Sequence, residues 1–594
     1  MKQFLKYMLA TICGLLVFSF INFFLFYACI AGIAALGSGE SVTKSKPHSV
    51  YMVDMSGVVV ERSNSDQFTS AFMEMAGREQ ADEYGLNDII KNIRKAKEDK
   101  NIEGICLRGG SLSMGMATAQ TIRRELLDFK ESGKFIIAYA DNYGQLNYYL
   151  ASCADKIMLN PIGAIDLHGL AIDIEFFKRL LDNVGVEMQV VKVGTFKSAT
   201  EPYILTSMSD ANRLQYQVLL DEIWHRLCTD ISKSRDISPE QLNELADRYM
   251  GLQPTEECLT AGLVDTLCYK EGIDSLLAQL CGTKDFKKLS YSDMLTLQVA
   301  KEKYSKEKIA VLYADGDITD EKGDGIVGKE IIKTISELTN KESVKAVVLR
   351  VNSPGGSAYA SEQIHHALSL CKGKKPLVVS MGDYAASGGY YISCPANYIF
   401  AENNTLTGSI GIFGVIPNMS GLTDKVGIDN DGVQTNRHGL FESNAVLKGM
   451  NAEERAMLQA EINRGYELFT SRCAEGRCIS QDSIKAVGEG RVWTGIHALQ
   501  LGLVDELGSL DDAIKKAAQL AGIDKYEIIE YPKLDDELTR LMKALGMDDA
   551  ADRIVSKIIG QEKYNILKVV ETLSAKPSVQ AMAPLEIQSI SKLQ

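Results

Sequence analysis

The segment Val344–Ser357 reads VKAVVLRVNSPGGS, an apolar run that leads directly into a Pro-Gly-Gly turn. A run made up mainly of β-branched and other apolar residues is typical of a strand that is buried on both faces of a parallel sheet. A helical stretch, Ala360–Leu370, follows, and Leu377–Met381 (LVVSM) has the pattern of a second buried strand. Strands that alternate with helices in this way predict a parallel α/β fold.

The same pattern occurs earlier in the chain. A shift of 242 residues aligns Gly104–Gly169 with Ala346–Gly411 without a gap. A shift of 240 residues aligns Gly262–Asp265 (GLVD) with Gly502–Asp505. Self-similarity at a fixed offset indicates one domain used twice, with short insertions or deletions in its loops. We therefore predict two tandem α/β domains.

The chain is expected to divide into four parts. Residues 1–46 hold a cytoplasmic N-terminus, a membrane anchor and a linker, residues 47–285 and 286–525 are the two copies, and residues 526–594 are a helical extension. Within the extension, Leu534–Leu545 and Ala551–Ile559 have the pattern of amphipathic helices. The sequence assigns no function to this extension.

The composition excludes several classes of protein. With 594 residues, the chain is much longer than one domain of roughly 100–200 residues. Hydrophobic residues make up 45% and charged residues 24%, which is ordinary for a folded protein. The net charge of −14 argues against a nucleic-acid partner, because phosphate binding requires a basic surface. The 12 cysteines are too few for a disulfide scaffold and lack the spacing of a zinc site.

The N-terminal stretch Tyr7–Gly37 contains no charged residue. It exceeds the roughly 20 apolar residues that a helix needs to cross a membrane, so a single-pass anchor is predicted. Lys2 and Lys6 precede it, which favours a cytoplasmic N-terminus and places the rest of the chain on the far side. A cleaved signal peptide is the alternative, but its apolar region is only about 7–15 residues long.

The two copies differ where chemistry is expected. In the second copy, Val351–Ser357 (VNSPGGS) places Gly355 and Gly356 between a strand and a helix, where backbone N–H groups can face an anion. The first copy has Ser113-Met114 at the aligned positions. An ordinary strand–helix turn is the alternative interpretation of this segment.

A candidate nucleophile, Ser387, lies in Asp383–Tyr391 (DYAASGGYY), among small neighbours that leave its hydroxyl uncovered. At the start of a helix, backbone amides can stabilise an oxyanion that forms beside such a serine. The first copy has Gln145 at this position, which cannot be a nucleophile. The alternative is that Ser387 is only a helix cap.

A serine nucleophile requires a base. None of the seven histidines lies in a recognisable catalytic setting, and His365 and His366 are expected on the solvated face of a charged helix. A buried lysine that has lost its proton is another possible base. Lys197 follows an apolar strand in Val190–Pro202 (VVKVGTFKSATEP), and the second copy has Gly439 at the aligned position. The serine is thus retained only in the second copy and the lysine only in the first, although an ordinary surface lysine is the alternative.

Four motifs together resemble a known family. VGTFKSATEP, VNSPGGS, DYAASGGYYIS and TGSIGIFG (Thr407–Gly414) are similar to those of the long, tandem-repeat form of bacterial signal peptide peptidase A, also called protease IV. The resemblance implies the fold that is shared by the Clp protease subunit and the crotonases. It also implies a set of roles: Ser387 as nucleophile, Lys197 as general base, Ser409 as a hydroxyl that orients the lysine, and the N–H groups of Gly356 and Gly388 as the oxyanion hole.

The resemblance further implies a reaction and a place in the cell. It predicts a serine endopeptidase that degrades remnant signal peptides on the periplasmic side of the bacterial inner membrane. The resemblance also implies a homo-oligomer, expected to be a tetramer, and no metal or organic cofactor. Because such peptides are apolar, an apolar cleft that pairs with an extended strand is expected.

Two other classes stay open at this point. One is a crotonase-like enzyme that acts on acyl-CoA thioesters with the same glycine loop, and the other is an inactive membrane scaffold. The sequence also leaves open whether Lys197 and Ser387 of one site come from one chain or from two neighbouring chains.

Overall fold

The computed structural model of the protein describes residues 44–63, 82–297, 305–321, 323, 325–534 and 579–582, together with positions 6, 7, 14, 17, 18 and 21. Most of the predicted anchor, Tyr7–Gly37, and most of both helices predicted in the C-terminal extension lie outside these residues. None of the described helices has the length and apolarity that are needed to cross a membrane.

The first copy is built on a parallel sheet with the strand order β2-β1-β3-β4-β5-β7, and β8 also pairs with β1. The elements of this part of the chain are β1 (Ser49–Val60), β2 (Glu83–Gly85), α3 (Leu86–Glu98), β3 (Ile102–Ser113), α4 (Met116–Lys130), β4 (Phe135–Ala140), α5 (Gln145–Ala151), β5 (Lys156–Leu159), α6 (Lys178–Val184), β6 (Glu187–Val193), α7 (Glu201–Ile204), α8 (Asp210–Arg235), α9 (Pro239–Asp247), the 3₁₀ turn η1 (Met250–Leu252), α10 (Thr255–Thr260), β7 (Thr266–Leu267), α11 (Glu271–Leu280), β8 (Lys287–Leu289) and α12 (Tyr291–Thr296).

The second copy has a sheet with the order β18-β16-β14-β12-β9-β20, and β15 and β19 extend it from β14. Its neighbouring strands are parallel except β16 and β18. The elements here are β9 (Lys308–Asp315), β10 (Ile318–Thr319), β11 (Ile326–Val327), α13 (Gly328–Asn340), β12 (Val344–Ser353), β13 (Gly355–Ser357), α14 (Ala358–Lys372), β14 (Leu377–Ala386), α15 (Gly388–Ser393), β15 (Tyr398–Ala401), β16 (Leu406–Gly408), β17 (Ile412–Asn418), α16 (Ser420–Val426), α17 (Phe441–Leu447), α18 (Ala452–Arg477), α19 (Gln481–Val487), β18 (Val492–Thr494), α20 (Gly495–Gln500), β19 (Glu506–Leu507), α21 (Leu510–Ala521), β20 (Glu527–Tyr531) and β21 (Val579–Met582).

The predicted duplication of an α/β domain is confirmed. The shift of 242 residues carries α3 onto α13, α4 onto α14 and α8 onto α18, and both ends of each pair coincide. The strands predicted from VKAVVLRV and LVVSM are β12 and β14. Beyond residue 525, the predicted start of the extension, the structure describes two strands: β20, which is the edge strand of the second copy's sheet, and β21.

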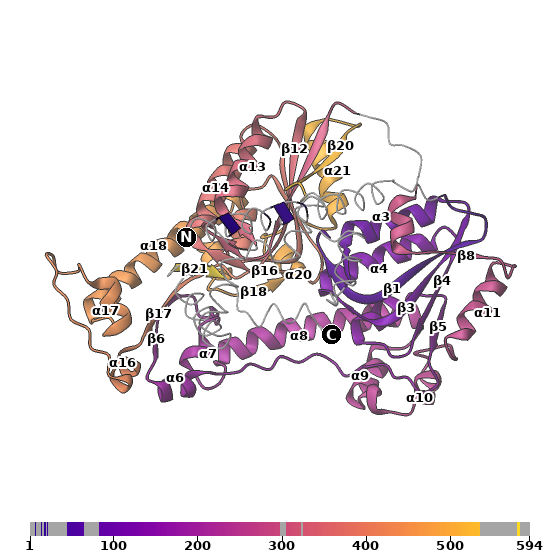
Figure 1. The fold of residues 1–594 in the computed structure, drawn as a ribbon, viewed down its shortest axis with the longest axis horizontal. Coiled ribbons are helices and arrows are strands. Elements are labelled where there is room, and N and C mark those ends of the chain that lie inside the picture. Colours follow the sequence, from indigo (N-terminus) through magenta and orange to yellow (C-terminus); the bar gives the residue numbers. More distant parts are fainter. Residues whose placement is uncertain are drawn as a thin grey trace.

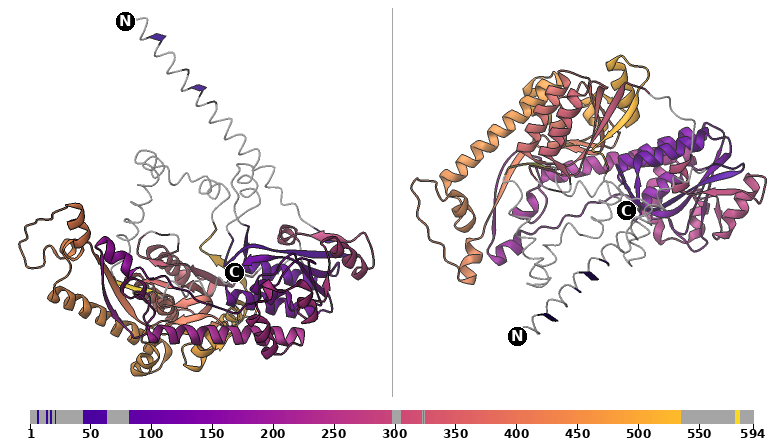
Figure 2. Two further views of the ribbon diagram at one scale, coloured as in Figure 1. Left: turned by 90° about the horizontal axis from the view of Figure 1, so that it is seen from below. Right: turned by 45° about the horizontal axis from the view of Figure 1, so that its top comes forward.

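A third sheet joins the two copies, with the strand order β11-β10-β13-β21-β17-β6. In it, β6 of the first copy pairs antiparallel with β17 of the second, from Val193↔Ile412 to Glu187↔Asn418. Together with α6 and α16, this pair forms an arm that projects from the body, and the long helix α8 connects the arm to the first copy (Figures 1 and 2). The segment that follows β6 is therefore brought to the second copy.

Polar contacts hold the first copy against the strands of the second. The carboxylate of Asp383 accepts hydrogen bonds from the N–H and the hydroxyl of Thr118, at 3.0 and 2.6 Å. Arg350 forms a buried pair with Glu61 through two N–O contacts of 2.9 and 2.8 Å. Removing one partner of such a pair leaves a charge buried without compensation, so these contacts fix the two copies relative to each other.

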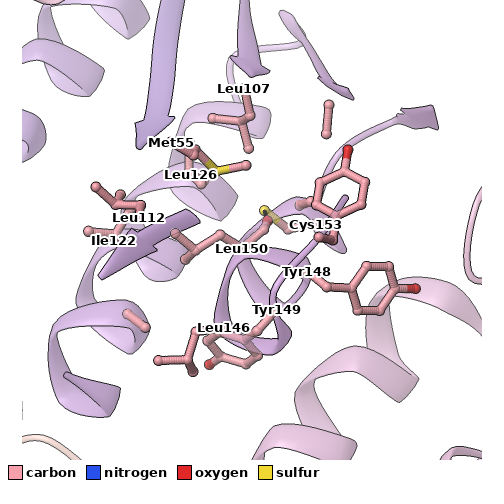
Figure 3. Close-up of a cluster of buried hydrophobic side chains, with 14 of the residues drawn as sticks. Met55, Leu107, Leu112, Ile122, Leu126, Leu146, Tyr148, Tyr149, Leu150 and Cys153 are labelled. Carbon is pink, nitrogen blue, oxygen red and sulfur yellow. Dashed lines mark hydrogen bonds between the residues drawn. The ribbon is translucent and has the colours of Figure 1, made fainter. Parts of the chain in front are cut away.

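Both copies anchor the helix after their central strand with buried tyrosines. Figure 3 shows the first copy, where Tyr148 and Tyr149 of α5 belong to a cluster of buried side chains from several elements. The Tyr148 hydroxyl donates to the carbonyl of Leu263 at 2.8 Å, and the aligned Tyr390 of α15 donates to the carbonyl of Leu503 at 2.9 Å. This shared packing holds α15, the helix that begins directly after Ser387.

Candidate active site

Ser387 lies at the junction between β14 and α15, in a backbone conformation that few residues adopt. Its φ is 56° and its ψ is −113°, and its N–H donates to the carbonyl of Gly408 at 2.8 Å. A residue other than glycine in a sparsely populated region of this kind costs about 1–3 kcal/mol and persists where the surrounding structure enforces it. The sharp turn places the serine at the N-terminal end of α15.

Lys197 reaches the same place from the first copy. It lies three residues after Gly194, at the end of β6, and contacts with Glu489 of the second copy hold the intervening loop. The Glu489 carboxylate accepts from the N–H and the hydroxyl of Thr195 at 3.0 and 2.7 Å, and its carbonyl accepts from the N–H of Phe196 at 2.9 Å. Glu489 could not be predicted as a site residue, because nothing in its local sequence pattern marks a contact with a segment almost 300 residues earlier.

The two side chains meet within one chain. The Lys197 Nζ lies 2.8 Å from the Ser387 Oγ, and both residues are fully buried. In this structure one chain supplies both groups.

Burial lowers the pKa of Lys197 well below its ordinary value, because the charged ammonium loses its hydration. The three oxygens in hydrogen-bonding contact with its Nζ are uncharged: the Ser387 Oγ and both the Oγ and the carbonyl oxygen of Ser409. These acceptors orient the amine, but they supply no negative charge that would favour its protonated form. The site therefore holds a lysine whose neutral form is favoured next to a serine hydroxyl.

Ser409 contacts the lysine as the motif TGSIGIFG predicts. Its Oγ and its carbonyl oxygen both lie 3.0 Å from the Lys197 Nζ. The backbone of Ser409 also has a positive φ, 50°, and its N–H donates to the carbonyl of Arg491 at 2.7 Å. Two serines with a positive φ thus contact one lysine, and residues in such sparsely populated backbone conformations cluster at functional sites.

Gly356 and Gly388 have no room for a side chain. Gly356 has a φ of 152°, and a methyl group there would lie 2.1 Å from the carbonyl oxygen of Ile318. A methyl group on Gly388 would lie 2.7 Å from the Oγ of Ser361. Glycine at these two positions therefore allows β13 to approach β10 and the start of α15 to approach α14.

In the first copy, Gln145 occupies the position that aligns with Ser387, and its side chain is bonded to backbone groups. Gln145 accepts hydrogen bonds from the N–H groups of His168 and Gly169, both at 3.2 Å, and donates to the carbonyl of Gly169 at 3.1 Å. Met114, which replaces a glycine of the second copy, is buried, and Gly439, which aligns with Lys197, lies in an exposed turn. The first copy therefore has neither the nucleophile nor the glycine loop.

The prediction for His365 is wrong. Its side chain is only 6% exposed and packs edge-on against the ring of Tyr391, whereas His366 is exposed as predicted. The reason is the helical spacing of Ser361, Ile364, His365 and Leu368, which face the core together.

The described residues also contain no group of three or more His, Cys, Asp or Glu side chains that is arranged to hold a metal ion.

Comparisons with known proteins agree with this architecture. The model of peptidase family S49 matches residues 128–284 and again residues 369–524, and the model of Clp protease matches residues 302–403. The chain is 35% identical to Protease 4 of Salmonella typhi over 94% of its own length and 91% of that protein. It is 35% identical to Protease 4 of Haemophilus influenzae, over 83% and 82% of the two chains. It is also 30% identical to the chloroplastic serine protease SPPA of Arabidopsis thaliana, over 84% and 73%. From these matches and from the tandem arrangement of the fold, the chain belongs to peptidase family S49 and is a serine protease with two copies of the family's domain.

Proposed function

We propose that this protein is a membrane-anchored endopeptidase that uses a Ser387–Lys197 dyad to degrade remnant signal peptides. The observation that carries the proposal is the 2.8 Å contact between the Lys197 Nζ and the Ser387 Oγ, inside a site where burial disfavours the ammonium form. Neutral lysine next to a serine hydroxyl is an arrangement that can activate the serine as a nucleophile.

In the proposed mechanism the Ser387 hydroxyl donates its proton to the neutral Lys197 amine as the Oγ attacks a peptide carbonyl. The N–H groups of Gly356 and Gly388 stabilise the oxyanion. The Lys197 ammonium then gives its proton to the leaving amine, and Ser409 holds the lysine in place between these steps. A water molecule hydrolyses the acyl-enzyme, with Lys197 acting as the base again.

The proposed substrate class rests on the resemblance to signal peptide peptidase A. An extended peptide that enters the sheet beside β13 satisfies its backbone groups by pairing, so specificity depends on side chains. We expect an apolar signal peptide in detergent micelles to be hydrolysed with a kcat/KM at least about tenfold above that of a polar peptide of the same length. Mass spectrometry of the products measures both rates. Equal rates for the two peptides would contradict the proposed substrate class.

Membrane anchoring through Tyr7–Gly37, with the catalytic domains on the periplasmic side of the inner membrane, is part of the proposal. It is supported by the uncharged length of this segment and by Lys2 and Lys6 before it. We expect protease added to spheroplasts to digest the bulk of the chain. Protection of the chain until the membrane is lysed would contradict the orientation.

A further inference from the structure

Two thiols that the proposed mechanism does not use lie behind the helix that begins after Ser387. Cys394 caps the C-terminal end of this helix, α15, and Cys473 belongs to α18. Both side chains are fully buried free thiols, and they are hydrogen-bonded to each other. The imidazole of His365 on α14 is also hydrogen-bonded to Cys394. Two thiols and one imidazole therefore meet in the core of the second copy.

Close packing of α15 against α18 brings the two thiols together. The ring of Tyr391 stacks on the ring of Phe469, with the centroids 4.3 Å apart. A methyl group on Gly476 would overlap the carbonyl oxygen of Cys394, so no side chain separates the two helices at this point. Phe469, Cys473 and Gly476 follow one another at helical spacing and share one face of α18. The face of α18 that packs on α15 therefore carries the second thiol.

The first copy has the same arrangement with different chemistry. At the shift of 242 residues, Arg123 aligns with His365. Arg123 donates to the hydroxyl of Ser152, which aligns with Cys394, at 2.7 Å. The position of the second thiol holds Ile231, which is buried. The fold thus brings the first two positions into contact in both copies, and sulfur occupies them only in the second copy.

The surroundings make the two thiols unequal. Burial raises the pKa of Cys473 well above its ordinary value. Burial also raises the pKa of Cys394, but the hydrogen bonds with Cys473 and His365 outweigh this effect and lower its pKa to about 6. The thiolate is the reactive form of cysteine, so Cys394 is the member of the pair that reacts first.

We propose that Cys394 and Cys473 are a site of reversible oxidation, at which a peroxide converts the two thiols into a disulfide. The oxidant must be small because both thiols are fully buried, and a peroxide meets this requirement where a bulky disulfide does not. The site is separate from the Ser387–Lys197 pair, so the proposal does not depend on the role of that pair in peptide hydrolysis.

The oxidation proceeds in two steps. The Cys394 thiolate attacks one oxygen of hydrogen peroxide, the O–O bond breaks, and Cys394 becomes a sulfenic acid. His365 can take the proton of this thiol and give it to the leaving hydroxide, which forms water. The Cys473 sulfur then attacks the Cys394 sulfur, the S–O bond breaks, and a second water leaves with the Cys473 proton. The two thiols lose two electrons and two protons, and one peroxide becomes two waters.

The disulfide would tie both sides of the candidate active site to one helix. Near its N-terminal end α18 holds β6, because Arg455 and Gln459 donate to carbonyl groups of this strand at 2.8 and 3.3 Å. This strand leads to Lys197, and α15 begins directly after Ser387. A covalent link between α15 and α18 therefore opposes separation of the two elements that carry the lysine and the serine.

The test is treatment of the purified full chain in detergent with hydrogen peroxide, followed by proteolysis without reductant and mass spectrometry. We expect the peptides of Cys394 and Cys473 to be joined with the loss of two hydrogen atoms, and a reductant to separate them. Cys473→Ala should leave Cys394 as a sulfenic acid, which dimedone labels. His365→Phe, which keeps a ring beside α15, should slow oxidation at pH 7 at least about tenfold.

The matched control is Cys371→Ala, which removes another buried thiol of α14 and should leave formation of the disulfide unchanged. The oxidised wild type should also unfold at least about 4 °C above the reduced protein, and Cys473→Ala should show no such difference. Wild-type protein that keeps both thiols, joins other cysteines instead, or gives a link that Cys371→Ala abolishes would overturn the proposal. Equal unfolding midpoints of the two wild-type forms would overturn the role of the link in holding the site together.

Discussion

Replacing Ser387 by alanine is expected to lower kcat for peptide hydrolysis by roughly a million-fold, the effect seen when a serine protease loses its nucleophile. Alanine has the same Cβ, so the positive φ of this residue costs the variant no more than it costs the wild type. The fold should therefore be kept, and the loss should come from chemistry alone. Steady-state hydrolysis of an apolar peptide, together with the thermal unfolding midpoint, measures both effects.

The matched control for this variant is Gln145→Ala, which changes the aligned position of the first copy. Gln145 bonds only to backbone groups of its own copy among the contacts that the structure gives, so we expect its loss to affect stability and to leave kcat unchanged. Turnover that survives in Ser387→Ala would exclude this residue as the nucleophile.

Replacing Lys197 by arginine is expected to lower kcat by at least about 10²–10⁴-fold, the contribution of a general base. Arginine keeps the positive charge, but it does not lose its proton in proteins. The wild-type rate should rise with pH, with a midpoint well below the ~10.4 of a free lysine, because burial lowers the pKa of Lys197. A pH–rate profile of the wild type and of Lys197→Arg measures both effects, and substantial activity in Lys197→Arg would contradict the dyad.

The same pKa change affects stability in a defined direction. The pKa of Lys197 is lower in the folded chain than in the unfolded chain, so between these two pKa values the unfolded chain binds more protons. The contribution of this group to stability therefore falls as the pH decreases through that window. Lys197→Met, which carries no titrating group, should remove this part of the pH dependence of the unfolding midpoint.

Much of the fold could be predicted from local sequence pattern. The runs VKAVVLRV and LVVSM lie in β12 and β14, because predominantly apolar runs of this length suit strands that are covered on both faces. The repeat offset of 242 residues indicates Lys197 and Ser387 as candidates, because the lysine occurs only in the first copy and the serine only in the second. Their roles rested in addition on the resemblance of four motifs to a family.

Other features depend on contacts between distant segments and have no local signal. The meeting of Lys197 with Ser387 requires β6 to pair with β17, and the segment aligned with β6 in the second copy is not a strand. Likewise, β21 lies beyond the two helices predicted in the extension, in a segment for which the sequence predicts no element, and it pairs with the edges of β13 and β17. The charged residues of its helix predict a solvated His365, whereas the side chain is buried against α15 because it shares the face of α14 that packs on the core.

The most direct test of the dyad is the rate at which a serine-directed fluorophosphonate labels the protein, with the labelled residue identified by peptide mass spectrometry. The account predicts that wild-type protein is labelled on Ser387, at a rate that rises with pH below the range in which a free lysine titrates. It predicts that Lys197→Arg is not labelled at any of these pH values. Labelling of Ser387 in Lys197→Arg at the wild-type rate, or labelling of another serine in the wild type, would contradict the account.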